Sequence, residues 1–417
     1  MALDLTRLDQ RTAAIDPHRL EIRLAQALSQ HAPEVEFIVL ARRAAGTAVA
    51  AALDAPNVRR ITVAEPGPTE LLLARVDAHL PGHTRRARLA RRLDWPRTLR
   101  RPVARWRPSL LRQLRVDLVL CPFTAPGITD PAIPLVAAVA DMQHLSHPHL
   151  LTSAERAIRA RGFDGISRYA DRILCTANSV RDAVVQSDGV RAGRVVTVPP
   201  TRLLSQLTQP PPSPAGVADA LGRFRLRERQ YFLVSVPGVI EPRHNLHLLL
   251  VALGILRARA PRLGVRVVCI GDATWPQGDL HTAAERMGLA DMVQFRGLVN
   301  RQDLSALILG SQAVIVPSLY ETIGDGALDA MALGRAVLCS DLSSLVDLSG
   351  DSALLFDPHR PADLAGAIER AASQPRLLDD LARRGQARLE AFDAAPTVAR
   401  TYLDAIRETR APCLASR

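Results

Sequence analysis

The chain has 417 residues, of which 47% are hydrophobic and 23% are charged, and its formal net charge is +11. This length predicts two or three domains, each able to bury a core without disulfides, and the composition excludes a disordered or fibrous protein. No apolar run reaches the roughly 18 residues of a membrane-spanning helix, and the charged N-terminus shows no signal peptide. Five scattered cysteines without a CxxC pair indicate a reducing, cytoplasmic compartment and no metal site.

In the first half of the chain, four short apolar runs predict buried strands, at 35–40, 116–121, 135–139 and 172–176. The segment between the first two of these strands is strongly basic. Twelve arginines and one acid lie from Arg85 to Arg115, so this segment carries the whole charge excess, and it also contains Trp95 and Trp106. The pattern is typical either of a solvated amphipathic helix or of a contact with an anionic membrane surface. Nucleic acid is disfavoured, because no DNA- or RNA-binding motif accompanies the charge.

A proline-rich patch at 209–214 separates the two halves, and the second half alternates regularly between strand and helix patterns. Strands are predicted at 231–236, 265–270, 293–295, 313–316 and 336–339, and helices at 245–259, 280–287, 301–309, 326–333 and 361–372. This alternation predicts parallel sheets covered by helices. The interpretation is an α/β protein with a first domain at 1–205, a linker at 206–229, a second domain at 230–390 and a C-terminal helix or tail at 391–417.

One loop of the second half has the residues expected of a binding site. The segment from Val314 to Gly334 predicts a strand, a glycine-bearing turn and a helix, and such a turn offers backbone N–H groups to an anion. Two carboxylates, Glu321 and Asp329, flank the turn and suit hydroxyl groups better than a bare phosphate. Phosphates together with hydroxyls describe a nucleotide sugar. A structural alternative stays open, in which Glu321 stabilises a helix N-terminus and Asp329 is a solvated surface residue.

At these residues the sequence resembles the family 4 retaining glycosyltransferases, and the resemblance covers about residues 116 to 390. It also includes Ile240-Glu-Pro-Arg-His-Asn-Leu246, Phe295-Arg-Gly297, Asp141-Met-Gln-His-Leu145 and Thr176-Ala-Asn-Ser179. Each motif is weak by itself, but their common order is specific. The resemblance implies the GT-B fold, which consists of two tandem Rossmann-like, doubly wound domains that face each other across a cleft.

The family also implies roles for particular residues. Glu321 would hold hydroxyls of the donor sugar, and Asp329 would hold the ribose. Backbone amides around Gly324, with Asp325 and Gly326 in the same loop, would surround the diphosphate, and Arg243 and His244 would lie beside it. The chain would approach the donor at Gly238 and the nucleobase at Gly297, and Asp141 belongs to the acceptor-side motif. The reaction would retain the anomeric configuration, without a metal or a further cofactor.

Several positions depart from the family pattern. His244 replaces a phosphate-binding lysine, Asp325 adds a carboxylate to the phosphate loop, and Ala140 replaces a histidine. The sequence at 13–19 reads Ala-Ala-Ile-Asp-Pro-His-Arg and lacks the glycines of the family's N-terminal loop. We therefore expect a hexosyltransferase that uses a nucleotide-diphosphate sugar and a glycan or lipid-linked acceptor in envelope polysaccharide synthesis. Two alternatives are a catalytically degenerate GT-B protein that binds a ligand or partner, and another GT-B activity such as a sugar-nucleotide epimerase. Arg243 and His244 could also be an ordinary surface cation and a loop residue.

Overall fold

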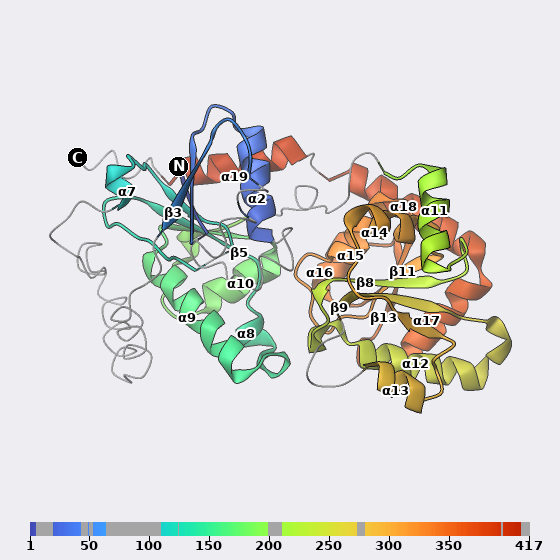
Figure 1. Cartoon of the computed structure of the whole chain (residues 1–417). Coiled ribbons are helices and arrows are strands. Elements are labelled where there is room, and N and C mark those ends of the chain that lie inside the picture. The colour runs from blue at the N-terminus through green and yellow to red at the C-terminus, as the bar shows by residue number, and fades with distance from the viewer. Residues whose placement is uncertain are drawn as a thin grey trace. The chain divides into compact units, whose positions relative to one another are not determined.

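The computed structural model describes residues 1–5, 20–42, 49, 53–63, 110–123, 125–198, 211–272, 280–392 and 395–409 (Figure 1). The chain divides into two compact units. The first is formed by Met1–Leu204 and Ala394–Arg417, and the second by Ser205–Asp393. No helix in the described part of the chain is long and apolar enough to cross a membrane.

The first unit is built on a parallel sheet with the strand order β3-β2-β1-β4-β5-β6-β7. Its strands are β1 (Ala2–Asp4), β2 (Phe37–Arg42), β3 (Val58–Val63), β4 (Val119–Cys121), β5 (Leu135–Val139), β6 (Arg172–Cys175) and β7 (Val195–Thr197). Its described helices are α2 (Leu20–His31), α7 (Leu110–Gln113), α8 (Gln143–Ser146), α9 (Ser153–Tyr169), α10 (Asn178–Gln186) and α19 (Ala395–Arg407), with 3-10 turns at Pro148–Leu150 and Ala192–Arg194. Helix α19 packs against α2, so the last described helix completes the unit that begins with the first strand.

The second unit has a parallel sheet with the order β10-β9-β8-β11-β12-β13. Its strands are β8 (Phe232–Val239), β9 (Val267–Asp272), β10 (Val293–Phe295), β11 (Ala313–Val316), β12 (Ala336–Ser340) and β13 (Ala353–Phe356). Its helices are α11 (Pro214–Phe224), α12 (Leu246–Arg259), α13 (Leu280–Arg286), α14 (Arg301–Gly310), α15 (Asp325–Ala332), α16 (Ser343–Ser349), α17 (Pro361–Ser373) and α18 (Pro375–Glu390), with 3-10 turns at Pro242–His244 and Pro261–Leu263. Numbered from β8, this is the 3-2-1-4-5-6 order of a Rossmann fold.

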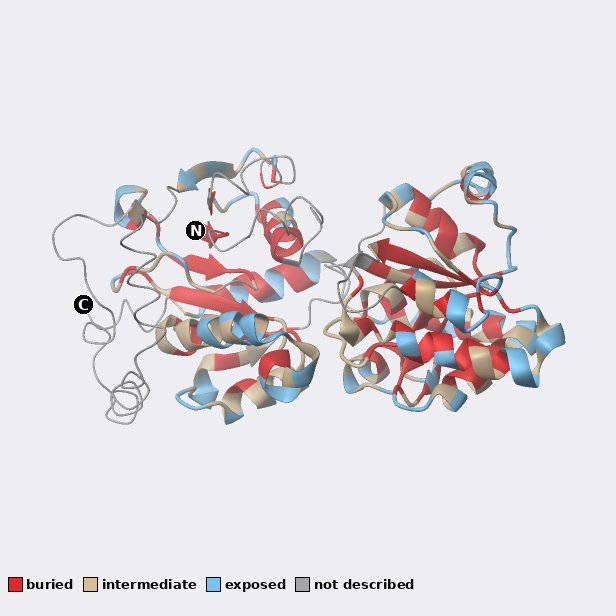
Figure 2. Ribbon diagram, turned by 60° about the horizontal axis from the view of Figure 1, so that its bottom comes forward, coloured by how far each residue is buried: buried red, intermediate tan, exposed pale blue. Residues whose placement is uncertain are grey.

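Helices cover both faces of the second sheet. Helices α12, α13 and α17 lie on one face, and α11, α14, α15 and α16 lie on the other (Figure 1). Buried side chains of each group pack against the strands in a separate core cluster. The strands between these layers are therefore almost continuously apolar, as in Ala313–Val316, where every residue is buried. Figure 2 shows the central strands of each unit as buried and the outer turns of the helices as exposed.

Strand β8 bends just before the candidate site. Its pairing with β9 shifts between Ser235 and Val239, which are opposite Ile270 and Asp272, so β8 contains a bulge. Gly271 lies beside the bulge with φ of 146°, and a Cβ there would come within 3.2 Å of the Val236 carbonyl oxygen. Glycine at 271 therefore allows the bulged strand to pack closely against β9.

The structure modifies the expected domain organisation at two places. The segment expected as a linker, 206–229, contains α11, whose Arg223 binds Asp303 of α14 at 2.7 Å, so α11 is part of the second unit. The segment expected as a C-terminal helix or tail, 391–417, contains α19, which belongs to the first unit.

Most of the basic segment, 85–109, lies outside the described residues. One of its arginines, Arg112 of α7, is in the described part and makes a two-pronged ion pair with Asp130, at 2.8 and 2.9 Å. Asp130 is 4% exposed. Arg112 therefore has a structural role, because it neutralises a buried carboxylate. For the other arginines of the segment, both a solvated amphipathic helix and a contact with an anionic membrane surface remain open.

Candidate active site

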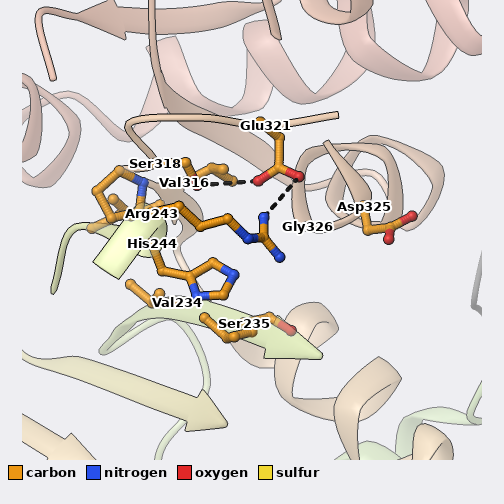
Figure 3. A pocket seen from close by; sticks show the side chains of 12 residues that line it. Val234, Ser235, Arg243, His244, Val316, Ser318, Glu321, Asp325 and Gly326 are labelled. Atoms are coloured by element: carbon orange, nitrogen blue, oxygen red, sulfur yellow. Dashed lines mark hydrogen bonds and ion pairs between the residues drawn. The ribbon is translucent and has the colours of Figure 1, made fainter. Parts of the chain in front are cut away.

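A pocket lies at the carboxyl ends of β8 and β11, the two central strands of the second sheet. The chain leaves these strands toward opposite sides of the sheet, and this reversal of strand order is where doubly wound sheets bind their ligands. The pocket is lined by residues of both strands and of the segments that follow them: Val234, Ser235, Val236, Arg243, His244, Ile315, Val316, Pro317, Ser318, Glu321, Asp325 and Gly326 (Figure 3).

The turn between β11 and α15 has a backbone conformation that favours glycine. Gly324 is the N-cap of α15 with φ of 77°, and a Cβ there would lie 2.8 Å from Leu345. The turn brings the first N–H groups of α15 to the pocket wall at Asp325 and Gly326. Such N–H groups have no partner within the helix and favour negative charge nearby. In Figure 3 the Asp325 carboxylate points away from the Arg243–Glu321 pair.

Glu321 is a nearly buried carboxylate whose side chain is 15% exposed. Ser318 Oγ donates a hydrogen bond to Glu321 Oε2 at 3.1 Å, and Arg243 Nη1 lies 3.8 Å from Oε1. Burial raises the pKa of Glu321, and Arg243 and Ser318 oppose that rise. Glu321 lies four residues before α15, and its side chain contacts Arg243 and Ser318. These contacts belong to the pocket and are not side-chain caps of the helix N-terminus, and the donor-sugar role of Glu321 stays a prediction.

Arg243 projects from the 3-10 turn at Pro242–His244, which directly follows β8. Its Nε donates to Glu241 Oε2 at 2.7 Å, and its carbonyl accepts the Leu319 N–H at 2.7 Å. Its side chain is only 25% exposed. Arg243 is therefore a half-buried cation of the pocket wall rather than an ordinary surface arginine.

His244 is 6% exposed and lines the same pocket. Its Nδ1 accepts a hydrogen bond from the Glu241 N–H at 2.8 Å. Burial, with a further contribution from the neighbouring Arg243, holds the pKa of His244 well below its ordinary value of 6.5. The ring is consequently neutral at physiological pH, so this position supplies no cation in place of the family's lysine.

Asn245 joins three loops around the pocket. Its Nδ2 donates to the carbonyls of Pro317 and Pro358, at 3.0 and 2.9 Å, from a left-handed backbone conformation with φ of 57°. These two bonds connect the turn after β8 to the loops that follow β11 and β13. The position of Arg243 and His244 relative to Ser318 and Glu321 therefore depends on Asn245.

Besides Gly324, which shapes the turn, three predicted residues of the second unit lie outside the lining of this pocket. Asp329 is 4% exposed within α15, so it is not the solvated surface residue of the structural alternative, and its ribose role stays a prediction. Gly238 lies in the bulged part of β8. Gly297 accepts the Gly271 N–H at 3.0 Å, which places it beside the end of β9.

Asp141 belongs to the first unit, where it follows β5. Its Oδ1 binds Arg159 at 3.0 Å and accepts the Gln143 N–H at 2.9 Å. The structure therefore does not bring Asp141 together with Glu321 and Arg243 in one unit. In the described residues, no group of three or more His, Cys, Asp or Glu side chains is arranged to hold a metal ion.

The site also contains residues to which the sequence analysis assigned no role, namely Glu241, Ser318, Ser235 and Asn245. Glu241 and Asn245 lie within the Ile240–Leu246 motif, and Ser318 precedes Glu321 by three residues. The contacts of Glu241 with Arg243 and His244, and of Ser318 with Glu321, were the missing information, because a linear motif does not show which side chains touch.

Two consecutive units with Rossmann-type sheets define the GT-B fold, and solved structures with that fold match almost the whole chain. HepE of Anabaena, in complex with UDP and glucose, has a TM-score of 0.67 and 16% identity, with 98% of this chain and 99% of that chain covered. WaaG, a glycosyltransferase involved in lipopolysaccharide biosynthesis, has a TM-score of 0.64 and 17% identity, with 97% and 99% covered. These likenesses establish the fold.

Residues 232–374 match the family model described as Glycosyl transferases group 1. O-antigen chain mannosyltransferase B of Escherichia coli is 28% identical over 223 residues, which cover 54% of this chain and 57% of that protein. A D-inositol 3-phosphate glycosyltransferase of Streptomyces bingchenggensis is 28% identical over 293 residues, covering 67% and 63%. The chain thus spans less than two thirds of the length of these relatives. Residues 232–374 are thus similar to this family, and the resemblance that the sequence motifs indicate is confirmed.

Proposed function

We propose that the protein is a retaining glycosyltransferase that moves a hexose from a nucleotide-diphosphate sugar to a glycan or lipid-linked acceptor. One observation carries the proposal: Arg243, His244, Glu321 and the first two residues of α15, Asp325 and Gly326, line one pocket at the centre of a Rossmann sheet. Retention of configuration is inferred from the family resemblance.

In this proposal the pocket binds the diphosphate and the adjoining hexose. Arg243 and the N–H groups at the start of α15 contact the phosphates, and Glu321 accepts hydrogen bonds from sugar hydroxyls. When the bond between the anomeric carbon and the phosphate breaks, negative charge develops on the departing diphosphate. Donors already fixed around that position stabilise the charge, and loss of one such donor typically lowers the rate about a hundred- to a thousandfold.

The relatives support an acceptor in envelope polysaccharide synthesis, since one of them is named O-antigen chain mannosyltransferase B. An acceptor of this kind would place the protein at the inner face of a membrane, and the Arg85–Arg115 segment would contact anionic lipid there. We expect co-sedimentation with vesicles to rise with their anionic lipid content and to fall with salt. Equal binding to neutral vesicles would contradict an electrostatic contact.

Calorimetric titration with UDP and GDP tests the proposed donor site. Wild type should bind one of them, and Arg243→Ala should weaken that binding by about ten- to a hundredfold, since a hydrogen bond to a charged group is lost. Arg262→Ala is the matched control, because Arg262 is an exposed arginine of the same unit outside the pocket. Glu321→Ala should leave nucleotide binding nearly unchanged and abolish transfer from the sugar nucleotide.

Other outcomes would favour the alternatives. If folded wild type binds neither nucleotide, the protein is a degenerate GT-B protein with a binding role. If it binds a sugar nucleotide and converts it to an isomer without transfer, it is an epimerase. Analysis of the products of the same incubation distinguishes these results.

A further inference from the structure

Helix α16 supports the segment between β11 and α15 at two places. Ser344 Oγ donates to the Glu321 carbonyl at 2.7 Å. Leu345 and Leu348 are 0% and 5% exposed and lie against Gly324, where an added Cβ would come within 2.8 and 3.1 Å of their side chains. A shift of α16 would therefore displace both the loop that carries Glu321 and the turn that begins α15.

The C-terminal end of α16 is held by a side chain of another helix. Because α16 has only seven residues, little of its stability comes from its own hydrogen bonds. The last four carbonyls of a helix have no partner within it. Two of them in α16, those of Asp347 and Leu348, accept hydrogen bonds from Arg388 of α18, from Nη2 at 2.7 Å and from Nε at 2.6 Å. The positive charge of Arg388 at this helix end is also favourable toward the helix dipole.

The packing around Arg388 keeps its guanidinium at the end of α16. Arg388 is partly buried, and its Cζ lies 5.6 Å from the centre of the Phe392 ring. On the other side, Gly350 follows α16 with φ of 56°, and a Cβ there would lie 2.8 Å from Arg388 Nη1. Glycine at 350 therefore leaves room for the guanidinium to reach both carbonyls. Arg388 is held between two elements and is not an ordinary surface cation.

We propose that Arg388 is a positioning residue of the donor site and acts through α16 on Glu321 and on the turn at Gly324. Arg388 does not line the pocket. It fixes the end of α16, and α16 in turn fixes the loop through Ser344 and the turn through its two leucines. This inference rests on the proposed function, in which Glu321 binds the donor sugar and the start of α15 binds the diphosphate.

A competing interpretation gives Arg388 a role in stability alone. The two interpretations differ in what they predict for the molecules that stay folded when the arginine is removed. If Arg388 only stabilises the unit, Arg388→Ala lowers the midpoint of thermal unfolding, and the folded protein keeps the loop and the rate of wild type. If Arg388 positions the loop, the folded variant has a less protected loop and a lower rate.

Hydrogen exchange followed by mass spectrometry tests the structural step without a ligand. In Arg388→Ala, peptides from 317–328 should exchange faster than in wild type, because the end of α16 has lost two hydrogen-bond donors, and peptides from β9 and β10 should not change. Arg384→Ala is the matched control, since Arg384 lies one turn earlier on α18 and pairs with Asp351 and Asp380, outside α16. Equal exchange at 317–328 in Arg388→Ala and wild type would overturn the inference.

A kinetic measurement tests the functional step. It follows the release of nucleoside diphosphate from UDP-glucose and from GDP-mannose, with water as the acceptor, well below the unfolding temperature of each variant. Arg388→Ala should be about tenfold slower than wild type, because small displacements of binding groups have effects of this order. Arg384→Ala should match wild type.

The variant Ser344→Ala shows whether the effect of Arg388 passes through α16. It removes the hydrogen bond to the Glu321 carbonyl and should itself slow the release. The double variant with Arg388→Ala should be at most about twofold slower than the slower single variant, because substitutions within one chain of contacts are not additive. Independent, multiplied effects, or a folded Arg388→Ala as fast as wild type, would overturn the inference and leave the proposed function intact. A folded wild type that releases no nucleoside diphosphate from either donor would overturn both.

Discussion

At the scale of single residues, the site combines two titratable side chains whose pKa values are shifted by burial. The pKa of Glu321 is raised and the pKa of His244 is lowered, so in each case burial favours the uncharged form. Arg243 partly offsets the rise in the pKa of Glu321, because its positive charge favours the ionised carboxylate. At His244 the positive charge of Arg243 lowers the pKa further, because it repels the protonated ring.

The buried His244 should make the second unit sensitive to acid. Its folded-state pKa is below 6.5, so the unfolded chain binds more protons below that pH, and the free energy of unfolding falls as the pH decreases through 6.5. Between pH 7.5 and 5.5 the loss should be about 1 kcal/mol smaller in His244→Gln than in wild type. Urea denaturation at the two pH values measures this difference. His247→Gln, at an exposed histidine three residues later, should match wild type, and equal acid sensitivity of all three proteins would contradict the prediction.

At the scale of elements, the pocket depends on short connections held by side chains. Asn245 connects the turn after β8 to the loops after β11 and β13, and Ser344 of α16 binds the Glu321 carbonyl at 2.7 Å. The loop that carries Glu321 is thus fixed from both sides. A site that must bind a flexible diphosphate benefits from such support, because the donors need no rearrangement on binding.

Asn245 should contribute to stability in two separable ways. Asn245→Ala loses two hydrogen bonds and places alanine in a left-handed conformation, so we expect it to lower the free energy of unfolding by about 2–3 kcal/mol. Asn245→Gly loses the same bonds but tolerates the conformation, and it should be about 1 kcal/mol more stable than the alanine variant. Urea denaturation of both variants tests this order. Alanine and glycine variants of equal stability would show that the left-handed backbone contributes nothing.

Five strands and five helices of the second unit were predicted from the sequence to within a few residues, but β13, α11, α16 and α18 were not predicted. The elements of the first unit were predicted only in part. Buried parallel strands such as β11 and β12 are continuous apolar runs, which stand out between helical patterns. Strand β1 was missed because it has three residues, and β3 because its exposed Arg59 and Arg60 hide the apolar positions. These strands are fixed by pairing with β2, and such pairing is a tertiary contact that periodicity does not show.

Residues of the candidate site that lie in a motif could be predicted from the sequence. Roles that depend on contacts with other side chains could not. Arg243, His244 and Glu321 were found through the family resemblance, and the pocket brings them together. The neutral state of His244 could not be predicted, because it depends on burial and on the N–H of Glu241. The burial of Asp329 likewise depends on which face of α15 packs inward.

At the scale of the whole molecule, each unit has its own core, and each core contains a buried tyrosine whose hydroxyl donates a hydrogen bond to a backbone carbonyl. Tyr402 of α19 is fully buried in the first unit and donates to the Val198 carbonyl at 2.9 Å. Tyr231 is 1% exposed in the second unit and donates to the Leu307 carbonyl at 2.6 Å. Each tyrosine connects two elements of its own unit, so damage at one should affect that unit first.

Alanine substitutions at these tyrosines should separate the stabilities of the two units. Truncation of a large buried aromatic side chain lowers stability by about 3–5 kcal/mol. Tyr402→Ala should raise hydrogen exchange in α2 and β1–β7 and leave β8–β13 protected, and Tyr231→Ala should do the reverse. Exchange followed by mass spectrometry resolves the two patterns. Loss of protection throughout the chain in both variants would show that the units unfold together.

The return of the chain to the first unit through α19 has a consequence for the order of synthesis. The whole of Ser205–Asp393 is made after the first sheet and before the helix that packs against α2. At about 5–20 residues per second, the ribosome leaves α2 without α19 for roughly ten to forty seconds. The second unit is continuous in sequence and can complete its fold in that interval. The part of the protein that is translated first is therefore completed last, and in the cell the side of α2 that α19 contacts is a natural target for chaperones until α19 emerges.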